Sequence, residues 1–557
     1  MRTRTSLGIA VLAIAPALAF ADDYFWAAPL DGYWSSADNW LGGVVPAEPD
    51  ADVLLDVPGD YTVTVTNLEG ISRSVNSLSL LATGAELVVA TGGGCHMDCT
   101  TGLTLTVAQS IVNDGHIIVP EWYFWIPPAQ LDVDSDSGSP PTISGSGAII
   151  LAGGSIQGNA HQMAGHTIEG AGHVELSTND GTIRASAQVD YMGEPHASLS
   201  VTLDTNNGLL ETTPGAHLGA VINTNNVPIS LPPNASMYLR FGSNTANVVG
   251  DADASLTLGE CHNASDVLID AAGASLDIIG PITGGTIRST PGADALIRGN
   301  VQATLEGEFT LGPDLTALRF TNNAVISIPS NLELDEPCDI DGVGEIRLLD
   351  NIRIGSNATA PSSIGAGQTI AGEGRLRFYG PCSFWGDFEP GDDDNAAQIY
   401  IFGAWTLHPT SDLRIDIFSH DDFDTLRSGF IFDNITLDGD VTLRFHAYVP
   451  ALADEFPFFT ASPRYHGGFD TLHTQGLNPA YKAVLIYRGL EVVARIVSAT
   501  CPADLDQPEG VLDFADVLAF LVAFANAEPP ADLAPPLGVY DFSDVFAYLT
   551  AFAAGCP

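Results

Sequence analysis

The nine residues that start at Ile143 read ISGSGAIIL, and the pattern returns as IEGAGHVEL at Ile168, IDGVGEIRL at Ile340 and IAGEGRLRF at Ile370. Each copy has an isoleucine, two glycines separated by one residue, and then apolar residues at alternate positions. Alternation with a period of two is typical of a strand that buries one face. Glycine lets the backbone turn a tight corner between two strands. The pattern therefore predicts a strand, a corner and a second strand as the repeating unit.

The copies are spaced like the turns of a coil. The first two begin at Ile143 and Ile168, and the last two at Ile340 and Ile370. Within each pair this is close to the length of one coil, because solenoid repeats of ~20–30 residues cannot bury an apolar face alone and must stack on their neighbours. We expect a mainly β fold: a long, parallel β-helix-like β-solenoid, a β-rich C-terminal cap, and a small α-helical pair of loop–helix repeats. A string of β-sandwiches is the alternative, and the scarcity of Asn-Gly hairpin signals favours the solenoid.

The chain is expected to have four parts. Residues 1–21 read as a secretory signal peptide, because two arginines precede a short apolar run and a small-residue cleavage site. Residues 22–410 are assigned to the solenoid with its N-terminal cap, residues 411–498 to the C-terminal cap, and residues 501–557 to the helical module. No later stretch is long and apolar enough for a transmembrane helix. We therefore expect a secreted, extracellular protein that is associated with the cell surface.

The charge of the chain limits its partners. The sequence has 68 acidic and 19 basic residues, and its formal net charge is −49. Such a chain repels a phosphate backbone, so nucleic-acid binding is disfavoured. The same charge attracts divalent cations.

Three stretches carry a family resemblance. The sequence YWSSADNWLGGVVP begins at Tyr33, GDFEPGDDDNAAQIYIFGAWTLHPTSDLRIDI begins at Gly386, and a longer closing segment begins at Asp421. Together they resemble exported bacterial β-solenoid proteins with autotransporter-associated strand repeats. The resemblance implies that Asp422, Phe423 and Asp424 help to build the end cap, with Leu437, Val441 and Leu443. It implies no catalytic residue.

The C-terminal region is an internal duplication with a constant offset between its two copies. The stretch DFADVLAFLVAF at Asp513 matches DFSDVFAYLTAF at Asp541. Apolar residues three and four apart predict two amphipathic helices that bury their stripes against each other. Asp513 and Asp541 occupy N-cap positions, and Asp516 and Asp544 follow three residues later, as in a capping box.

The loops before these helices resemble dockerin repeats, the paired loop–helix form of the EF-hand that docks onto cohesin modules. Calcium takes six to eight oxygen ligands, and the resemblance assigns them in the first loop to Asp504, Asp506, Glu509, the Val511 carbonyl, Asp513 and Asp516. The second loop is degenerate: it keeps Asp532, Asp541 and Asp544, whereas Ala534 and Leu537 replace ligands. We expect at most one calcium ion, in the first loop. The implied partner is a cohesin-like or cell-envelope docking protein.

Seven cysteines in an exported chain should mostly be paired. Cys501 and Cys556 bracket the duplication, so a disulfide between them would close a loop of roughly 55 residues and add ~4 kcal/mol of stability. Cys95 and Cys99 predict a small-loop disulfide, with a metal or redox site as the alternative. The other three cysteines have no evident partner.

Two features of the sequence are candidate sites for binding or cleaving a polysaccharide. Trp122, Tyr123 and Trp125 form the densest aromatic stretch, which either stacks on sugars or fills a core. Arg375 and Arg377 share a strand face with Glu373, the nearest approach to a polysaccharide lyase site, although a surface ladder explains them equally well. We expect a non-enzymatic structural or adhesive protein tethered by its dockerin-like module. The alternative is a polysaccharide-binding or polysaccharide-degrading component of a cohesin–dockerin assembly, as a lyase or glycoside hydrolase of β-helix type.

Overall fold

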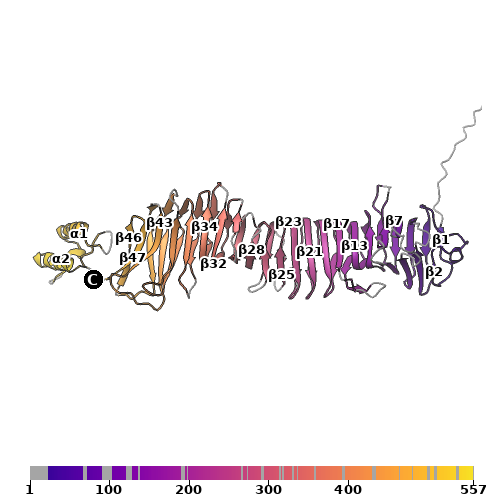
Figure 1. Ribbon diagram of the computed structural model, residues 1–557, viewed down its shortest axis with the longest axis horizontal. Coiled ribbons are helices and arrows are strands. Elements are labelled where there is room, and N and C mark those ends of the chain that lie inside the picture. Colours follow the sequence, from indigo (N-terminus) through magenta and orange to yellow (C-terminus); the bar gives the residue numbers. More distant parts are fainter. Residues whose placement is uncertain are drawn as a thin grey trace, which may run out of the picture. The chain divides into compact units, whose positions relative to one another are not determined.

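The computed structural model confirms that the protein is mainly β, with α-helices α1 (Phe514–Ala525) and α2 (Phe542–Ala554) in the described part of its C-terminal region. The structure describes residues 23–66, 72–90, 103–120, 128–135, 138–189, 195–196, 198–264, 268–271, 274–289, 294–312, 315, 319–328, 332–334, 336–356, 359–391, 395–429, 434–462, 464–479, 481–498, 502–506, 511–534 and 539–555. The chain divides into two compact units, Met1–Ala220 and Val221–Pro557. Within each unit, successive strands lie side by side (Figure 1).

The first unit is built from parallel strands that place like residues above one another. One column of fully buried apolar side chains passes through seven strands, each residue facing the next in register. Its members are Val63 in β4 (Tyr61–Thr66), Leu87 in β6 (Ala85–Ala90), Ile117 in β8 (His116–Pro120), Ile149 in β11 (Ala148–Gln157), Ile168 in β13 (Thr167–Asn179), Ile183 in β14 (Thr182–Ala185) and Leu210 in β18 (Leu209–Thr212). Alternate residues of these strands face outward, as the period of two predicts.

In the motifs that begin at Ile143 and Ile340 the glycines lie between two strands, as the sequence predicts, whereas the motifs at Ile168 and Ile370 lie within the single strands β13 and β34 (Thr369–Phe378). The first glycine of each copy, such as Gly145 or Gly372, has a positive φ between 92° and 122°. A Cβ atom at Gly145 would lie 2.2 Å from the Asn113 carbonyl oxygen, so only glycine fits this position.

The register differs from the motif spacing. Ile149, which follows the second glycine of the first copy, faces Ile168, which begins the second copy. The last two copies repeat this arrangement, because Ile346 faces Ile370. In both pairs, facing residues are therefore closer in sequence than equivalent residues of the two motifs. The second half of one motif pairs with the first half of the next.

A tryptophan cluster closes the first strands of this unit. Trp26, Trp34 and Trp40 are each at most 2% exposed, and their rings meet edge to face with centroids 5.0 Å apart. Trp34 donates its indole N–H to the Pro46 carbonyl at 3.1 Å. Buried indole nitrogens need such a partner. The two tryptophans of the YWSSADNW stretch are therefore core residues, whereas its Tyr33 is 53% exposed.

The second unit also has parallel columns, and it contains a ladder of amides like the buried Asn179–Asn206 pair of the first unit. Asn225 donates to Asn244 at 2.8 Å, and Asn244 donates to Asn263 at 2.9 Å, at an offset of 19 residues each time. Between these amides, β20 (Ile229–Leu231) pairs in parallel with β22 (Val248–Gly250), and β21 (Ser236–Asn244) pairs with β23 (Ser255–Asn263). Each buried amide thus satisfies its neighbour.

Three columns of strands follow one another between residues 369 and 475. All three are parallel throughout. The first column consists of β34 (Thr369–Phe378), β37 (Gln398–Phe402), β40 (Thr425–Gly429) and β43 (Glu455–Ser462). The second consists of β35 (Cys382–Phe384), β38 (Trp405–Leu407), β41 (Ile435–Leu437) and β44 (Tyr465–Gly467). The third consists of β36 (Asp387–Pro390), β39 (Asp412–Ile417), β42 (Asp440–Phe445) and β45 (Thr471–Gln475).

The pairing changes at the end of this region. Strand β47 (Glu491–Ser498) is antiparallel both to β43 and to its hairpin partner β46 (Tyr481–Arg488). Val441 and Leu443, which the resemblance assigns to an end cap, are fully buried in β42, and Leu437 is buried in β41.

Candidate functional site

The C-terminal module, residues 502–555 as far as they are described, has a small core shared by its two copies. Phe520 of α1 stacks on Tyr548 of α2, with ring centroids 4.0 Å apart and planes 12° apart. Ala503 and Ala531, one from each loop, are fully buried against this pair. All four residues obey the offset that relates Asp513 to Asp541, so the duplication in sequence is also a duplication in structure.

Both helices begin with the predicted capping box. The Asp513 side chain accepts a hydrogen bond from the Ala515 N–H at 2.6 Å, and the Asp541 side chain accepts one from Ser543 at 2.7 Å. In return, Asp516 and Asp544 accept hydrogen bonds from the N-cap main chain. The acids therefore satisfy the N–H groups that a helix start leaves without partners.

Asp516 and Asp544 also hold the loops. Oδ1 of Asp516 accepts hydrogen bonds from the Leu505 and Asp506 N–H groups at 2.7 and 2.8 Å. Oδ1 of Asp544 accepts hydrogen bonds at 2.8 Å from Leu533 and Ala534, the equivalent residues of the second loop. Both side chains are buried. Main-chain donors hold the pKa of Asp544 below its usual value, because they favour the charged carboxylate.

The expected calcium ligands of the first loop are thus placed differently from one another. The Asp504 side chain is 1% exposed, and the Lys482 Nζ lies 3.9 Å away. Asp506 and Asp513 are exposed, and Val511 is half-buried. Oδ1 of Asp516 already accepts two hydrogen bonds, so this oxygen has no further lone pair for a cation. A calcium ion there would depend on Asp504, Asp506, Val511 and Asp513, together with Glu509, which lies outside the described residues.

The second loop has fewer candidate calcium ligands than the first. Ala534 has no side-chain oxygen, and Leu537, which lies outside the described residues, has none either. Oδ1 of Asp544 is engaged by main-chain donors in the same way as that of Asp516. In the described part of the chain, no group of three or more His, Cys, Asp or Glu side chains could hold a metal ion.

Part of each amphipathic stripe is exposed. The sequence predicted that both stripes would be buried between the helices, but burial reaches only one edge of each. On α1, Phe514 is 77% exposed and Leu518 is 54% exposed; on α2, Phe542 is 78% exposed and Phe546 is 65% exposed. Leu521 and Leu549 extend the two rows, at about half exposure. We call these six residues the twin apolar rows.

The twin apolar rows were present in the sequence but were misassigned. Phe514, Leu518 and Leu521 have the spacing i, i+4, i+7, which places them on one side of a helix. Phe520 and Val517 lie on the adjacent side of α1. That side packs into the core of the module, where Phe520 is buried and Val517 is partly buried. A helix with apolar residues over more than one stripe either is buried on two sides or has an open face.

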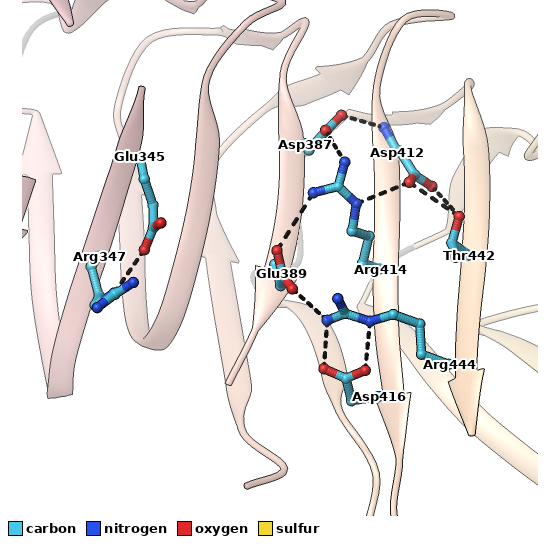
Figure 2. A network of polar contacts seen from close by, with 9 residues as sticks. All are labelled: Glu345, Arg347, Asp387, Glu389, Asp412, Arg414, Asp416, Thr442 and Arg444. Carbon is cyan, nitrogen blue, oxygen red and sulfur yellow. Dashed lines mark hydrogen bonds and ion pairs between the residues drawn. The ribbon is translucent and has the colours of Figure 1, made fainter. Parts of the chain in front are cut away.

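A second concentration of charged groups lies on the third strand column (Figure 2). Arg414 contacts Asp387 at 2.6 Å and Asp412 at 3.2 Å. Arg444 binds both oxygens of Asp416 at 2.6 Å, and Glu389 lies between the two arginines. Arg414 and Arg444 are thus each paired with more than one carboxylate, whereas Arg347, also drawn in Figure 2, pairs with Glu345 alone among the described residues.

Beside this network, Asp424 is a buried carboxyl group. It accepts hydrogen bonds from the Ala397 N–H at 2.8 Å and the Asp416 N–H at 2.9 Å. Burial raises the pKa of Asp424 to about 8, and the negative charge of Asp416 acts in the same direction, while the two N–H donors offset part of the rise. The DFD stretch that the resemblance assigned to the end cap therefore places one acid in the interior.

Several predicted site residues lie outside the described residues. They are Cys95, Cys99, Trp122, Tyr123, Trp125, Cys501, Glu509 and Cys556. The two expected disulfides and the aromatic stretch therefore remain predictions. The other three cysteines, Cys261, Cys338 and Cys382, are free thiols in the strand core. Burial raises the pKa of Cys261 and Cys338 to about 12.

Comparison with known proteins gives no assignment, because no protein-family model and no curated protein sequence matches this chain. In the described residues, no helix combines the length and the apolar character that a membrane span requires.

Proposed function

We propose that this is a non-enzymatic, extracellular structural or adhesive protein: a β-solenoid tethered to the cell surface through its C-terminal dockerin-like module. The observation that carries the proposal is the pair of twin apolar rows. Large exposed apolar patches on a soluble chain mark interaction sites, and these two rows occupy equivalent positions of a duplicated unit.

Parallel pairing supports the solenoid part of the proposal. Each strand between residues 369 and 445 pairs with the strand one turn later, and three strands complete a turn before the chain returns to the same column. Stacked repeats of this kind bury a continuous core although no single repeat could do so. In this proposal the strand region is the part that the docking module attaches to the cell surface.

The docking partner is proposed to be a cohesin-like protein or another protein of the cell envelope. Phe514 and Phe542 each begin a helix and project an apolar side chain that this module does not cover. Interfaces are held by a few such aromatic anchors in an apolar centre. The partner should therefore offer an apolar surface that accepts either row.

Retention at the cell surface tests the proposal. Cells that secrete the full-length protein should hold most of it at their surface. The variant Leu518→Lys/Phe546→Lys, which places a charge in each row, should appear in the medium instead. Both positions are exposed, so the variant should fold. Binding of the full-length protein to purified cohesin domains, measured by calorimetry, should be lost in the same variant.

A matched control separates docking from a general effect of charge. Val343 is 74% exposed on the strand region, and Val343→Lys should leave retention unchanged. If the double variant stays on the cells as the wild type does, then the twin apolar rows are not the tether and the proposal fails.

A further inference from the structure

The first strand column presents arginine and aromatic side chains on its outer face. Arg375 of β34, Tyr400 of β37 and Arg427 of β40 face one another in register. Arg377 of β34 faces Phe402 in the same way. Their neighbours in sequence, such as Leu376, Ile401 and Leu426, are buried. Together with Tyr379, which is 56% exposed, these side chains form what we call the arginine–aromatic face.

Aromatic rings hold the guanidinium groups of this face. The Arg375 and Arg427 guanidinium carbons lie 5.7 and 6.0 Å from the centroid of the Tyr400 ring. Tyr400 is stacked with Phe402, with centroids 6.0 Å apart and planes 10° apart. Arg377 lies 4.5 Å from the Tyr379 ring and donates to its hydroxyl group. Cation–π contact orients a guanidinium without neutralising its charge.

The contrast with the neighbouring column is informative. In Figure 2, both Arg414 and Arg444 contact two or more carboxylates. Among the described residues, ion pairs within 4.0 Å are found for those arginines but not for Arg375, Arg377 or Arg427. The chain has 68 acidic residues, so three arginines set against aromatic rings, and not in ion pairs, distinguish this face, although Glu373 shares the same side of β34.

A hollow of about 490 Å³ adjoins this face. Its lining includes Glu373 of β34 and Ala397, which precedes β37, so it opens at the edge of the same two strands. Asn395 and Arg347 contribute further polar groups to its wall. Hydrogen-bonding groups in a hollow beside an aromatic surface suit a ligand with many hydroxyl groups.

We propose that the arginine–aromatic face binds an acidic polysaccharide, one that carries a carboxylate on some of its sugars. A guanidinium group recognises a carboxylate through two parallel N–H donors. The rings of Tyr379, Tyr400 and Phe402 supply apolar surface for the faces of the sugars. Adjacent strands are ~4.8 Å apart, so a ligand with repeated anionic groups can contact several positions at once.

The charge of the whole protein narrows the class of ligand. A net charge of −49 opposes a dense polyanion. Nucleic acid, with one charge per phosphate, is therefore disfavoured even though arginine and aromatic side chains also suit single strands. A polysaccharide that carries a uronate on only some of its sugars has a lower charge density. It still offers carboxylates to the arginines and sugar faces to the aromatic rings.

Calorimetry with full-length protein tests the proposal. The probes are hyaluronate, which carries a carboxylate on every second sugar, neutral dextran and a thymidine oligonucleotide. We expect binding to hyaluronate that weakens as salt is added, and no binding to dextran or to the oligonucleotide. The variant Arg375→Gln/Arg427→Gln should weaken hyaluronate binding at least tenfold, and Tyr400→Leu should weaken it as well.

The control variant is Arg240→Gln. Arg240 is also an exposed arginine, but it pairs with Glu260 at 2.6 Å, so its removal should leave binding unchanged. Equal loss in the control and in the double variant, unchanged affinity of the double variant, or absence of binding by the wild type would overturn the proposal. Tighter binding of the oligonucleotide would instead assign the face to nucleic acid. The variant Arg375→Gln/Arg427→Gln leaves the twin apolar rows intact, so the docking function predicts that cells still retain it. Loss of polysaccharide binding with normal retention therefore separates this proposal from the docking function.

Discussion

At the residue scale, the acidic residues that both C-terminal loops share include those that accept main-chain hydrogen bonds. The second C-terminal loop has lost the acids that correspond to Asp506 and Glu509, yet it keeps Asp532, Asp541 and Asp544. Asp541 and Asp544 accept main-chain hydrogen bonds that the helix start and the loop require. Their retention therefore needs no metal. The repeated capping pattern was readable from the sequence, whereas the bonds from Asp516 and Asp544 back to the loops join residues ten or eleven apart and required the structure.

The first prediction concerns Asp424 and pH. Its pKa is about 8 in the folded protein, against an ordinary value of 3.8, so the folded state favours the protonated form. The stability that this group contributes is present in full below about pH 4 and is lost as the pH rises through 8. In Asp424→Asn this pH dependence is absent. Urea unfolding between pH 5 and 7.5 should show the wild type losing up to ~1.4 kcal/mol per pH unit relative to the variant.

The exposed Asp421 provides the control for this experiment. Asp421→Asn should keep the wild-type dependence on pH, because it leaves the buried carboxyl group in place. A stability difference between wild type and Asp424→Asn that is constant from pH 5 to 7.5 would show that Asp424 is ionised in the folded protein throughout this range.

At the element scale, each loop and its helix form one unit that depends on a single acid. The second prediction compares Asp544→Ala with Asp541→Ala. The loss of Asp541 removes the side-chain acceptor for the Ser543 N–H and for the N3 N–H of the capping box, and it should cost about 0.5–2 kcal/mol. The loss of Asp544 leaves the N–H groups of Leu533, Ala534 and Asp541 without their acceptor, so it should lower the melting temperature of the module further. Scanning calorimetry of the full-length protein measures both changes, and an equal effect of the two variants would contradict the proposed role of Asp544.

The third prediction concerns calcium in the first loop. The informative variant is Asp506→Ala, because only the main-chain N–H of Asp506 is needed for its bond to Asp516. Calcium that binds only the folded module raises its stability, by about 2.7 kcal/mol at one hundred times the dissociation constant. The rise in melting temperature with calcium should disappear in Asp506→Ala and persist in Asp532→Ala. If Asp532→Ala removes the rise as well, the second loop also contributes to the ion site.

At the scale of the whole molecule, the sequence predicted the character of the strands better than their register. Alternation in a stretch such as YTVTVT, which begins at Tyr61, is local and correctly predicts which residues are buried. The offset between neighbouring strands is set by the lengths of corners, so the spacing of two similar motifs does not give it: Ile149 faces Ile168, the first residue of the next motif, and not the equivalent residue of that motif. The arginine–aromatic face could not be predicted from the sequence for the same reason. Arg375 and Arg427 lie far apart along the chain, and only the register places both beside the Tyr400 ring.

The last prediction tests whether this register makes the strand region modular. Residues 226–244 are one period of 19, from the residue after Asn225 through Asn244. Their deletion should place the Asn225 amide beside Asn263, where Asn244 stood, and put Val248 in the position of Ile229. Every inward side chain then stays inward, because a whole period has been removed.

The control is deletion of β21 alone, residues 236–244. It keeps β20 but removes the strand that should follow it, so β22 meets a partner with the wrong register. We expect the first variant to be secreted with a circular dichroism spectrum and an unfolding midpoint close to those of the wild type, and the second to be degraded. Equal tolerance of both deletions would mean that neighbouring strands here do not depend on a common register, and the solenoid proposal would lose its main support.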